Sequence, residues 1–276
     1  MSISLSKVIK GINKRIDKFT NNPLKDVGIS KLKYTSIKHE TGLAIKHCKI
    51  YNCDFVYKNS EEFIHGIKEI FIDNIYKLPL RNDSTLILDC GSNIGMSIIY
   101  LKKMLPNAKV IGFEPDKTNF NLLEKNIINF NLDNVILINK AVWTKQGRIG
   151  FDNSGSMSSK IDENNSSNFI ETERLKDYLN NEVYFLKIDI EGAEYQVLKD
   201  IEGNLGNVEN LFVEYHGNYN ETFKLSEIID ILNRNNFQIY IKEAANIYQT
   251  PFIKSDNKFS FDVQLNIFAI RNQNEK

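Results

Sequence analysis

The sequence has few of the features that mark secreted, membrane-spanning or metal-stapled proteins. Its 276 residues include three cysteines, an odd number without paired spacing, so we expect neither a disulfide framework nor a zinc site. Its apolar runs fall short of the ~18–20 residues that a membrane-spanning helix needs. The amino-terminal stretch also lacks the continuous apolar core of a signal peptide. These absences predict a protein of the reducing cytoplasm.

An excess of charge of either sign is also missing. The 35 lysines and arginines are balanced by 35 aspartates and glutamates, which gives a formal net charge of zero. Proteins that bind nucleic acid need a basic surplus to neutralise phosphates, so we expect no nucleic-acid partner. The hydrophobic share of 42% and the charged share of 25% are typical of a globular chain. The length suits one α/β domain of roughly 200–250 residues with an amino-terminal extension.

The first eighty residues predict an extension made of a helix, a hairpin and a second helix. Apolar residues recur at helical spacing over residues 5–19, with basic residues on the other faces. Segments 34–37 and 43–50 read as short strands around a turn at Gly42, and residues 60–78 as a helix with Ser60 as its N-cap. The first helix packs on its own domain, joins a second subunit in a homodimer, or touches an anionic membrane surface. We favour packing on its own domain or on a second subunit over contact with a membrane.

From Thr85 onward the pattern changes to alternating strands and helices, so we expect residues 81–276 to form the main domain. Short apolar strands alternating with helices predict a parallel sheet that is covered on both faces. The Ser- and Asn-rich segment 152–168 has little periodicity and predicts either a lid or a disordered connection. The expected strands are 86–88, 110–113, 135–138, 183–188, 211–215, 237–241 and 265–270, and the expected helices are 94–105, 117–129, 193–200 and 226–233.

The segment from Leu86 to Gly95 carries the most information about a ligand. A buried strand ends at Asp89, a glycine turn follows at Gly91, and Gly95 opens the next helix. Glycine lets the backbone approach a ligand closely, and the helix amino terminus offers unpaired N–H groups. A dinucleotide-binding motif needs glycine where Ser92 stands, and the Gly-Lys-Ser/Thr of a phosphate-binding P-loop is absent. The turn therefore predicts a small nucleoside cofactor, with a nicotinamide-dependent oxidoreductase as the alternative.

Glu114 supports a cofactor site because it ends the second strand of this unit. An acidic residue at that distance along the chain reaches a ribose diol, and its carboxylate accepts both hydroxyl groups. Alone, Asp89 could be a helix cap and Glu114 a solvated strand end. Their occurrence together, each at a strand end, favours cofactor binding.

Five short motifs together resemble one family. They are DCGSNIG at 89–95, FEP at 113–115, NKAVW at 139–143, LKIDIEGAE at 186–194 and FVEYH at 212–216. This set is similar to the FkbM-type class I methyltransferases, which use S-adenosylmethionine, over about residues 72–270. The resemblance implies a Rossmann-like α/β fold whose seven-stranded, mostly parallel sheet has a reversed last strand. The first seventy residues match no motif.

The resemblance also implies where the cofactor lies. The glycine turn would hold the methionine part and Glu114 the ribose, while the segment after the third strand would lie against the adenine. The residues expected to bind the cofactor are Asp89, Gly91, Ser92, Asn93, Gly95, Glu114, Ala141, Val142 and Asp189.

Two further strand ends carry the groups expected to act on the methyl acceptor. Asp189 ends one strand, and Glu214 and His216 end the next; if these strands are neighbours, the three side chains gather beside the cofactor turn. Transfer to a hydroxyl needs close positioning and removal of a proton. We expect His216 to be neutral near pH 7 and to act as the base. Asp189 and Glu214 would orient it, contact the cofactor or hold a Mg²⁺ ion. His216 as a structural residue and Glu191 as a helix amino-terminal carboxylate are the alternatives.

These observations predict an S-adenosylmethionine-dependent methyltransferase that methylates an oxygen. The family likeness implies that the acceptor is a hydroxyl of a sugar or glycan, or of a small-molecule natural product, and no residue chooses between them. A nicotinamide-dependent oxidoreductase and a non-catalytic, methyltransferase-like binding module are the alternatives.

Overall fold

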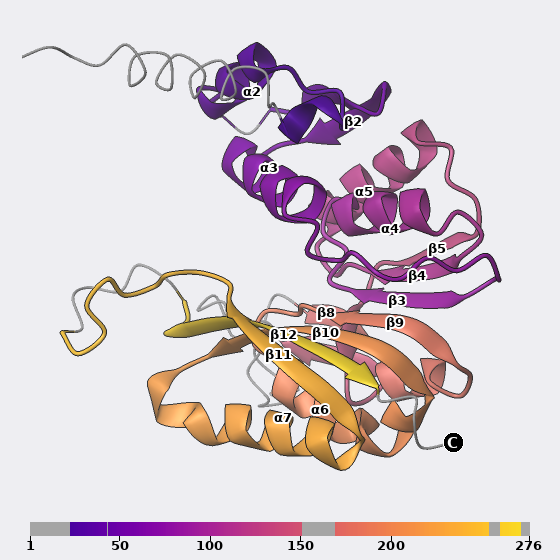
Figure 1. The fold of residues 1–276 in the computed structure, drawn as a ribbon, viewed down its shortest axis with the longest axis vertical. Coiled ribbons are helices and arrows are strands. Elements are labelled where there is room, and N and C mark those ends of the chain that lie inside the picture. The colour runs from indigo at the N-terminus through magenta and orange to yellow at the C-terminus, as the bar shows by residue number, and fades with distance from the viewer. Residues whose placement is uncertain (1–22, 43, 151–168, 254–259, 272–276) are drawn as a thin grey trace, which may run out of the picture.

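The computed structural model describes residues 23–42, 44–150, 169–253 and 260–271, and Figure 1 shows a single large sheet between two layers of helices. The expected helix over residues 5–19 and the expected lid over 152–168 lie outside the described residues. The sheet has seven strands in the order β11-β12-β10-β9-β3-β4-β5. Their bounds are β3 Leu86–Cys90, β4 Lys109–Phe113, β5 Val135–Ile138, β9 Val183–Ile188, β10 Val208–Gly217, β11 Phe237–Glu243 and β12 Val263–Arg271.

Strand direction confirms the fold that the resemblance implied. The pairs β3–β4, β4–β5, β3–β9 and β9–β10 are parallel, whereas β12 runs antiparallel to both β10 and β11. The last strand is therefore reversed in a sheet that is otherwise parallel. A parallel sheet gathers the carboxyl ends of its strands at one edge, which is where ligands bind in α/β folds.

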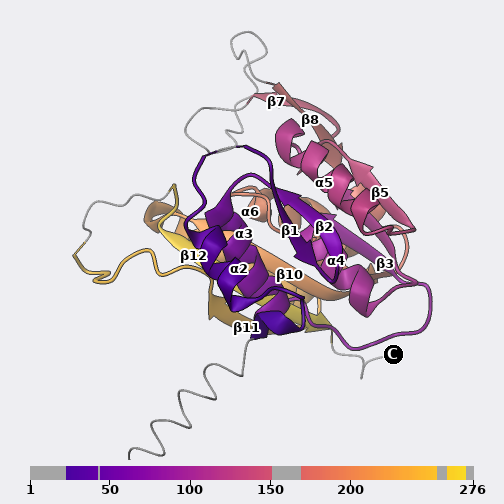
Figure 2. The same ribbon diagram turned by 90° about the horizontal axis from the view of Figure 1, so that it is seen from above.

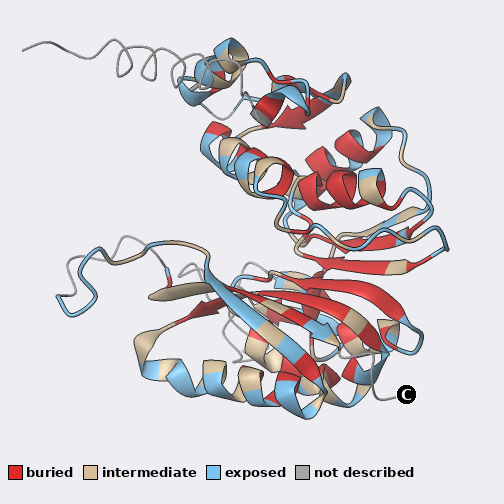
Figure 3. Cartoon of the chain, viewed as in Figure 1, coloured by how far each residue is buried: buried red, intermediate tan, exposed pale blue. Residues whose placement is uncertain are grey.

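Helices cover both faces of this sheet because its strands are apolar on both sides. Figure 1 places α4 (Met96–Met104) and α5 (Lys117–Asn129) on one face, and α6 (Glu194–Ile201) and α7 (Thr222–Arg234) on the other. Successive strand residues enter different cores: Ile87 packs in the core beneath α4 and α5, and Leu88 in the core beneath α6 and α7. Figure 3 shows the central strands buried along most of their length. The predicted two-faced parallel sheet is confirmed.

The expected hairpin was placed wrongly. Residues 34–37 belong to a helix, α2 (Lys31–Lys38), and the hairpin is formed instead by β1 (Lys46–Ile50) and β2 (Cys53–Tyr57). Its two-residue turn, Tyr51 and Asn52, has φ values of 52° and 66°. Two consecutive residues with positive φ give the tight turn whose twist matches that of the flanking strands. The Thr-Gly pair at residues 41–42 looked like a turn but lies in the connection before β1.

The second helix of the extension begins as expected and then changes type. Helix α3 spans Ser60–Gly66, but its N-cap is Asn59, whose Oδ1 accepts from the backbone N–H groups of Glu61 and Glu62. The chain continues as a π-helix, η2 (Ile67–Ile72), which crosses above the sheet. In Figure 2, α2, α3, β1 and β2 lie over the strands, beside α4 and α5.

The described part of the extension shares a hydrophobic core with the helices of the main sheet. Phe55, Phe63 and Ile67 are almost completely buried in the same cluster as Leu123 of α5. Asn126 of α5 is fully buried and links the two parts. Its Oδ1 accepts from the N–H of Val56, and its Nδ2 donates to the carbonyls of Val56 and Ile94. Strand β2 is thus joined through α5 to the glycine turn.

The sequence did not predict a second, three-stranded sheet. It consists of β6 (Ala141–Trp143), β8 (Phe169–Arg174) and β7 (Gly147–Gly150), paired in that order. The remaining short helices are η1 Pro23–Lys25, η3 Leu175–Tyr178, η4 Glu202–Asn207 and η5 Tyr219–Glu221. Within the described ranges, no helix combines the length and the apolar character that crossing a bilayer requires.

Candidate active site

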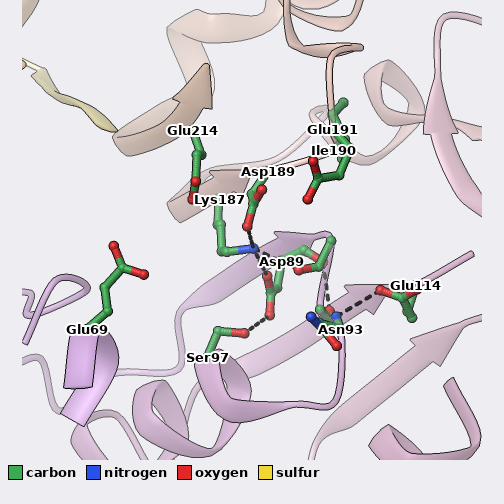
Figure 4. Close-up of polar contacts among 12 residues, drawn as sticks. Glu69, Asp89, Asn93, Ser97, Glu114, Lys187, Asp189, Ile190, Glu191 and Glu214 are labelled. Carbon is green, nitrogen blue, oxygen red and sulfur yellow. Dashed lines mark hydrogen bonds and ion pairs between the residues drawn. The ribbon is translucent and has the colours of Figure 1, made fainter. Parts of the chain in front are cut away.

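A row of polar side chains crosses one edge of the main sheet, on the face beneath the extension. Asp89 pairs in register with Lys187, and Glu214 with Asn266. Residues paired in register point to the same face of the sheet, and so do residues two apart along one strand. These polar side chains and Asp189 therefore lie on one face, at the carboxyl edge, beyond the apolar residues of the same strands. Strands β9 and β10 are neighbours, as the sequence argument required. Figure 4 shows these acidic side chains gathered around the Lys187 amine.

The glycine turn lies in contact with the strand end that carries Asp189. Gly91 has a φ of 87°, and a Cβ at this position would lie 1.8 Å from the backbone oxygen of Asp189. Gly95 has a φ of 94°, and its Cβ would lie 2.7 Å from Cδ1 of Leu123. Both positions therefore need glycine for conformation and for space. The backbone of the turn, rather than side chains, forms this part of the site.

Glu114 is held in place by backbone donors from both sides. Its Oε2 accepts from the N–H of Asn93 and its Oε1 from the N–H of Asp116, each at 2.8 Å, and the residue is 6% exposed. Burial raises the pKa of Glu114 to about 7, although the two backbone N–H groups favour the ionised form. The carboxylate is thus fixed at the end of β4 and changes charge near neutral pH.

Asp89 and Lys187 form a buried charged pair behind the turn. Asp89 is fully buried; its Oδ2 accepts from Ser97 Oγ at 2.5 Å, and its Oδ1 lies 3.4 Å from Lys187 Nζ without a hydrogen bond within the described part of the chain. Lys187 Nζ donates to the Gly91 carbonyl at 2.8 Å and lies 3.2 Å from Asp189 Oδ2. Burial lowers the pKa of Lys187, but Asp189 and Asp89 outweigh it and hold that pKa well above its usual value. Lys187 is therefore a cation at every physiological pH.

Lys187 was missed in the sequence analysis, although the sequence contains a signal for it. It is the only charged residue in the otherwise apolar strand 183–188, and it stands two positions before Asp189. Residues two apart in a strand share a face, so a lysine here must be buried beside that carboxylate. A buried lysine needs a partner, which Asp189 and Asp89 provide.

Two cavities open beside the glycine turn, and both are lined by Gly91, Asn93, Asp189 and Glu191. One cavity, of about 190 Å³, also contacts Glu114, Ala141 and Val142, three of the residues expected to bind the cofactor. The other, of about 240 Å³, extends toward α3 and η2 and contacts residues from both the extension and the sheet: Glu62, His65, Gly66, Glu69, Ile70, Tyr76, Ser92, Ile94, Met96, Ser97, Lys187 and Glu214.

The structure brings together most of the residues expected to bind the cofactor, along these two cavities. Ser92 lines the larger of the two, and its Oγ donates to the Asp89 carbonyl at 3.0 Å. Asp89 and Gly95 are exceptions, because they lie behind the wall and shape it. A third cavity, of about 560 Å³, lies at the opposite edge of the sheet around Arg81, Glu209 and Arg271 and contains none of the expected residues.

His216 is buried among carboxylates and is not neutral. Its Nδ1 lies 3.1 Å from Glu194 Oε1, and its Nε2 lies 3.6 Å from Glu191 Oε2 and 3.7 Å from Glu214 Oε1. Burial lowers the pKa of His216, but the carboxylates, led by Glu194, raise it more, to about 9. The expectation of a neutral His216 near pH 7 is therefore wrong. An imidazolium has no lone pair with which to remove a proton.

The same protonation bears on the expected metal site. One potential ligand atom from each of Asp189, Glu214 and His216 lies within 4.8 Å of the others, which is close enough to surround an ion. A metal-binding histidine must be neutral, however, and Mg²⁺ prefers oxygen ligands. His216 itself supplies the positive charge among these acids. His216 would have to lose its proton to bind an ion there, and no step is assigned to a metal.

Glu214 and Glu194 differ in their surroundings although both face His216. The pKa of Glu214 is raised to about 8. Burial is the largest cause, and the negative charge of Asp189 also contributes to this increase. Glu194 is 1% exposed and accepts from the N–H groups of Ile190 and Gly192 as well as facing His216. Glu194 therefore fixes the turn after β9, a positioning role that the sequence did not reveal.

Comparison with known proteins agrees with this geometry. Residues 89–239 match the methyltransferase FkbM domain. The chain is 28% identical over 182 residues to "Methyltransferase 1" of Beauveria bassiana, covering 55% of this chain and 72% of that protein. It is 27% identical over 199 residues to "Methyltransferase sdnD" of Sordaria araneosa, covering 58% and 76% respectively.

Among solved structures, a methyltransferase FkbM from Methylobacillus flagellatus matches with a TM-score of 0.47 and 21% identity. That match covers 68% of this chain and 44% of the other, so this chain accounts for less than half of that protein's length. The match to the family domain begins at the Asp89 strand end and runs through β10 and α7 into β11, over more than half of the sequence. The chain belongs to the methyltransferase FkbM domain family.

Proposed function

We propose that this chain is an S-adenosylmethionine-dependent O-methyltransferase that acts on a hydroxyl of a sugar, glycan or natural product. The observation that carries the proposal is the pair of cavities that meet at Asp189. They make a continuous path from Ala141 and Val142, past Glu114 and the glycine turn, to Glu214. Family membership favours methyl transfer over the nicotinamide-dependent alternative, since the turn has Ser92 where a dinucleotide motif needs glycine.

The residues along this path fit S-adenosylmethionine by charge and by shape. Ala141 and Val142 offer an apolar wall for the adenine, and Glu114 offers two carboxylate oxygens to the ribose hydroxyls. The larger cavity is acidic, which suits a ligand with a sulfonium and an ammonium group. When bound, the cofactor supplies an electrophilic methyl group.

On the acceptor side, we assign proton removal to Glu214 rather than to His216. A sugar hydroxyl is barely acidic, so its attack is helped by a base whose pKa lies near the working pH. Glu214 lines the cavity and has a pKa of about 8. His216, as an imidazolium 3.7 Å from Glu214 Oε1, favours the ionised form of that carboxylate. Asp189, anchored by Lys187 at the junction of the cavities, positions the reacting groups.

The acidic cavity also supports the expected class of partner. Phosphate-rich acceptors would be repelled by its carboxylates, which favours a small molecule or glycan over a nucleic acid.

We place the activity in the cytoplasm, because Cys48, Cys53 and Cys90 are all free thiols. A non-catalytic binding module would bind the same nucleoside, so only a measurement of methyl transfer distinguishes that alternative from this proposal.

Calorimetric titration with S-adenosylhomocysteine, followed by transfer assays with radiolabelled S-adenosylmethionine on hydroxylated acceptors, tests the proposal. We expect wild type to bind the nucleoside and Asp189→Ala to lose transfer by at least about 100-fold while remaining folded. Lys199→Ala, a change in an exposed side chain, is the control. Failure of wild type to bind either nucleoside would overturn the proposal. Binding without transfer to any acceptor would favour the binding module.

A further inference from the structure

The larger cavity has one wall that the known cofactor motifs do not account for. This wall comes from the extension: Glu62 and His65 lie on α3, Glu69 on η2, and Tyr76 just beyond it. It faces the sheet across the cavity, and Figure 4 shows Glu69 and Glu214 directed into the same region from opposite sides. We call this cavity of about 240 Å³ the reaction chamber. The extension forms its wall on the side where an acceptor would enter.

Negative charge exceeds positive charge in this chamber. Carboxylates line it from the extension and from the strand ends, and Lys187 is the single lysine among its described lining residues. The amine of Lys187 is already shared between Asp89 and Asp189. Glu69 and Glu214 face the chamber with no lysine or arginine partner among the ion pairs of the described residues; Glu69 Oε2 lies 3.7 Å from Nδ1 of the exposed His65, and Glu214 Oε1 lies 3.7 Å from Nε2 of His216. A bound cation would relieve their repulsion.

A buried amide gives a second, independent indication of a missing donor. Asn266 is 1% exposed, and its Nδ2 donates to Glu69 Oε1 at 3.3 Å. Its Oδ1 has no hydrogen-bond partner anywhere in the described ranges. Asn266 pairs in register with Glu214, so its side chain points to the chamber face of the sheet and reaches Glu69 there. A buried acceptor without a donor is rare and is explained when a ligand brings the donor.

Tyr76 favours an organic cation over a metal ion. Its ring packs edge-on against Phe212, with centroids 5.0 Å apart, and forms part of the chamber wall. An aromatic ring attracts an ammonium group through its π-face, and carboxylates and amide oxygens accept the ammonium hydrogens. Mg²⁺ would instead require a near-octahedral set of oxygens. Glu69 and Tyr76 in the chamber wall, with the Asn266 amide hydrogen-bonded behind Glu69, offer the mixture of groups that suits an ammonium.

We propose that the acceptor carries a protonated amine and that Glu69, with Tyr76 and Asn266 beside it, binds this ammonium and determines acceptor specificity. The inference rests on the proposed methyltransferase function and narrows its substrate class to aminated sugars or other amino compounds. The hydroxyl that receives the methyl group lies nearer to Glu214, and the ammonium lies toward the extension. Neutral acceptors of the same shape lose the charge interaction with Glu69.

Paired probes that differ only in charge test this directly. Protein saturated with S-adenosylhomocysteine is titrated with D-glucosamine and with D-glucose, and binding is followed by NMR. We expect glucosamine to bind at least about tenfold more tightly than glucose to wild type, since charged hydrogen bonds add ~1.5–3 kcal/mol. Glu69→Gln, which retains an oxygen for Asn266, should remove this preference. Glu61→Gln, an exposed carboxylate on α3 outside the chamber lining, should retain it.

The outcomes separate this inference from the proposed function. Loss of nucleoside binding in wild type would count against the methyltransferase itself. Nucleoside binding with equal or no response to glucosamine and glucose would overturn the amine assignment alone. A preference that survives Glu69→Gln would overturn the role of Glu69. Mg²⁺ that binds the same chamber and displaces glucosamine would likewise overturn the assignment in favour of a metal ion.

Discussion

At the scale of single residues, the site depends on charges that are buried with their partners. Lys187 is 2% exposed, and its amine contacts two carboxylates and the Gly91 carbonyl. Removing one member of such a group leaves an uncompensated buried charge, which typically costs ~3–5 kcal/mol. Lys187 therefore joins the ends of β3 and β9 and the glycine turn into one rigid unit. A rigid unit of this kind can hold a cofactor without reorganisation.

If Glu114 holds the ribose as proposed, cofactor binding depends on pH. Its pKa is about 7 in the folded protein, so the carboxylate that would accept the ribose hydroxyls is mostly protonated at pH 6. We expect affinity for S-adenosylhomocysteine to be about tenfold weaker at pH 6 than at pH 8, measured by calorimetry. Glu114→Ala should bind weakly at both values and show no step. A pH-independent wild-type affinity would contradict the assignment of Glu114 to the ribose.

The same group has the opposite effect on the stability of the unliganded protein. Its folded pKa lies above the ordinary value of 4.5, so the folded state binds more protons than the unfolded state between these values. The free energy of unfolding contributed by Glu114 therefore decreases as pH rises from about 4.5 to about 7. The decrease amounts to roughly 1.4 kcal/mol for each unit of pKa difference. Keeping a carboxylate buried for the ligand thus destabilises the unliganded fold.

At the scale of elements, the glycine turn is placed by its contact with β9. The backbone oxygen of Asp189 occupies the space that a side chain at position 91 would need. The backbone N–H of Asp189 in turn donates to the Cys90 carbonyl at 3.1 Å. The turn between β3 and α4 is therefore determined jointly by its own sequence and by a strand nearly one hundred residues later.

Gly91→Ala tests this contact. The added Cβ would meet a backbone atom, which cannot move aside as a flexible side chain can, and the φ of 87° adds strain. We expect the free energy of unfolding to fall by about 3 kcal/mol or more and nucleoside binding to be lost. Gly203→Ala is the matched control, because no atom lies within 4 Å of its Cβ position. It should change stability by less than about 0.5 kcal/mol. Similar effects of the two substitutions, measured by urea unfolding, would contradict this account.

At the scale of the whole molecule, the extension and the sheet are joined by a common core. Phe55 and Phe63 from the extension are buried with Leu101 and Leu123 from the helices above the sheet. Asn126 adds buried hydrogen bonds across the same junction. The extension also contributes one wall of the reaction chamber. Fold stability and, in our proposal, acceptor recognition therefore depend on the same packing.

Removal of the extension is expected to unfold the rest of the chain. A protein that begins at residue 81 would expose the apolar face of α4 and α5 and leave the chamber open on one side. We expect it to aggregate or to show no cooperative thermal transition, whereas the full chain unfolds cooperatively. Circular dichroism during heating measures the difference. A cooperative transition in residues 81–276 alone would show that the sheet domain folds independently.

Prediction from sequence worked where the deciding interactions are local. Apolar periodicity identified the strands and helices of the main sheet, and the spacing of Asp89, Gly91 and Gly95 predicted a glycine turn between β3 and α4, where the structure has one. The hairpin was misplaced because short strands are weakly marked, and the Tyr51–Asn52 turn carries no glycine. The charge state of His216 was wrong because it depends on Glu194 and Glu191, whose carboxylates converge on the ring only in the folded chain.

The order of apolar, glycine and acidic residues along this chain was sufficient to predict an α/β sheet with a glycine turn after its first strand, since these features follow from short-range backbone preferences. The reversed last strand was expected only from the family resemblance, because it depends on pairing between distant segments. Tertiary structure alone decided which charges meet. It buried Lys187 between two acids, placed Glu69 of the extension opposite Glu214, and left Asn266 Oδ1 without a donor among the residues that the structure describes. Charge interactions in a buried site act through space over a few ångströms, and those distances do not exist until the chain has folded.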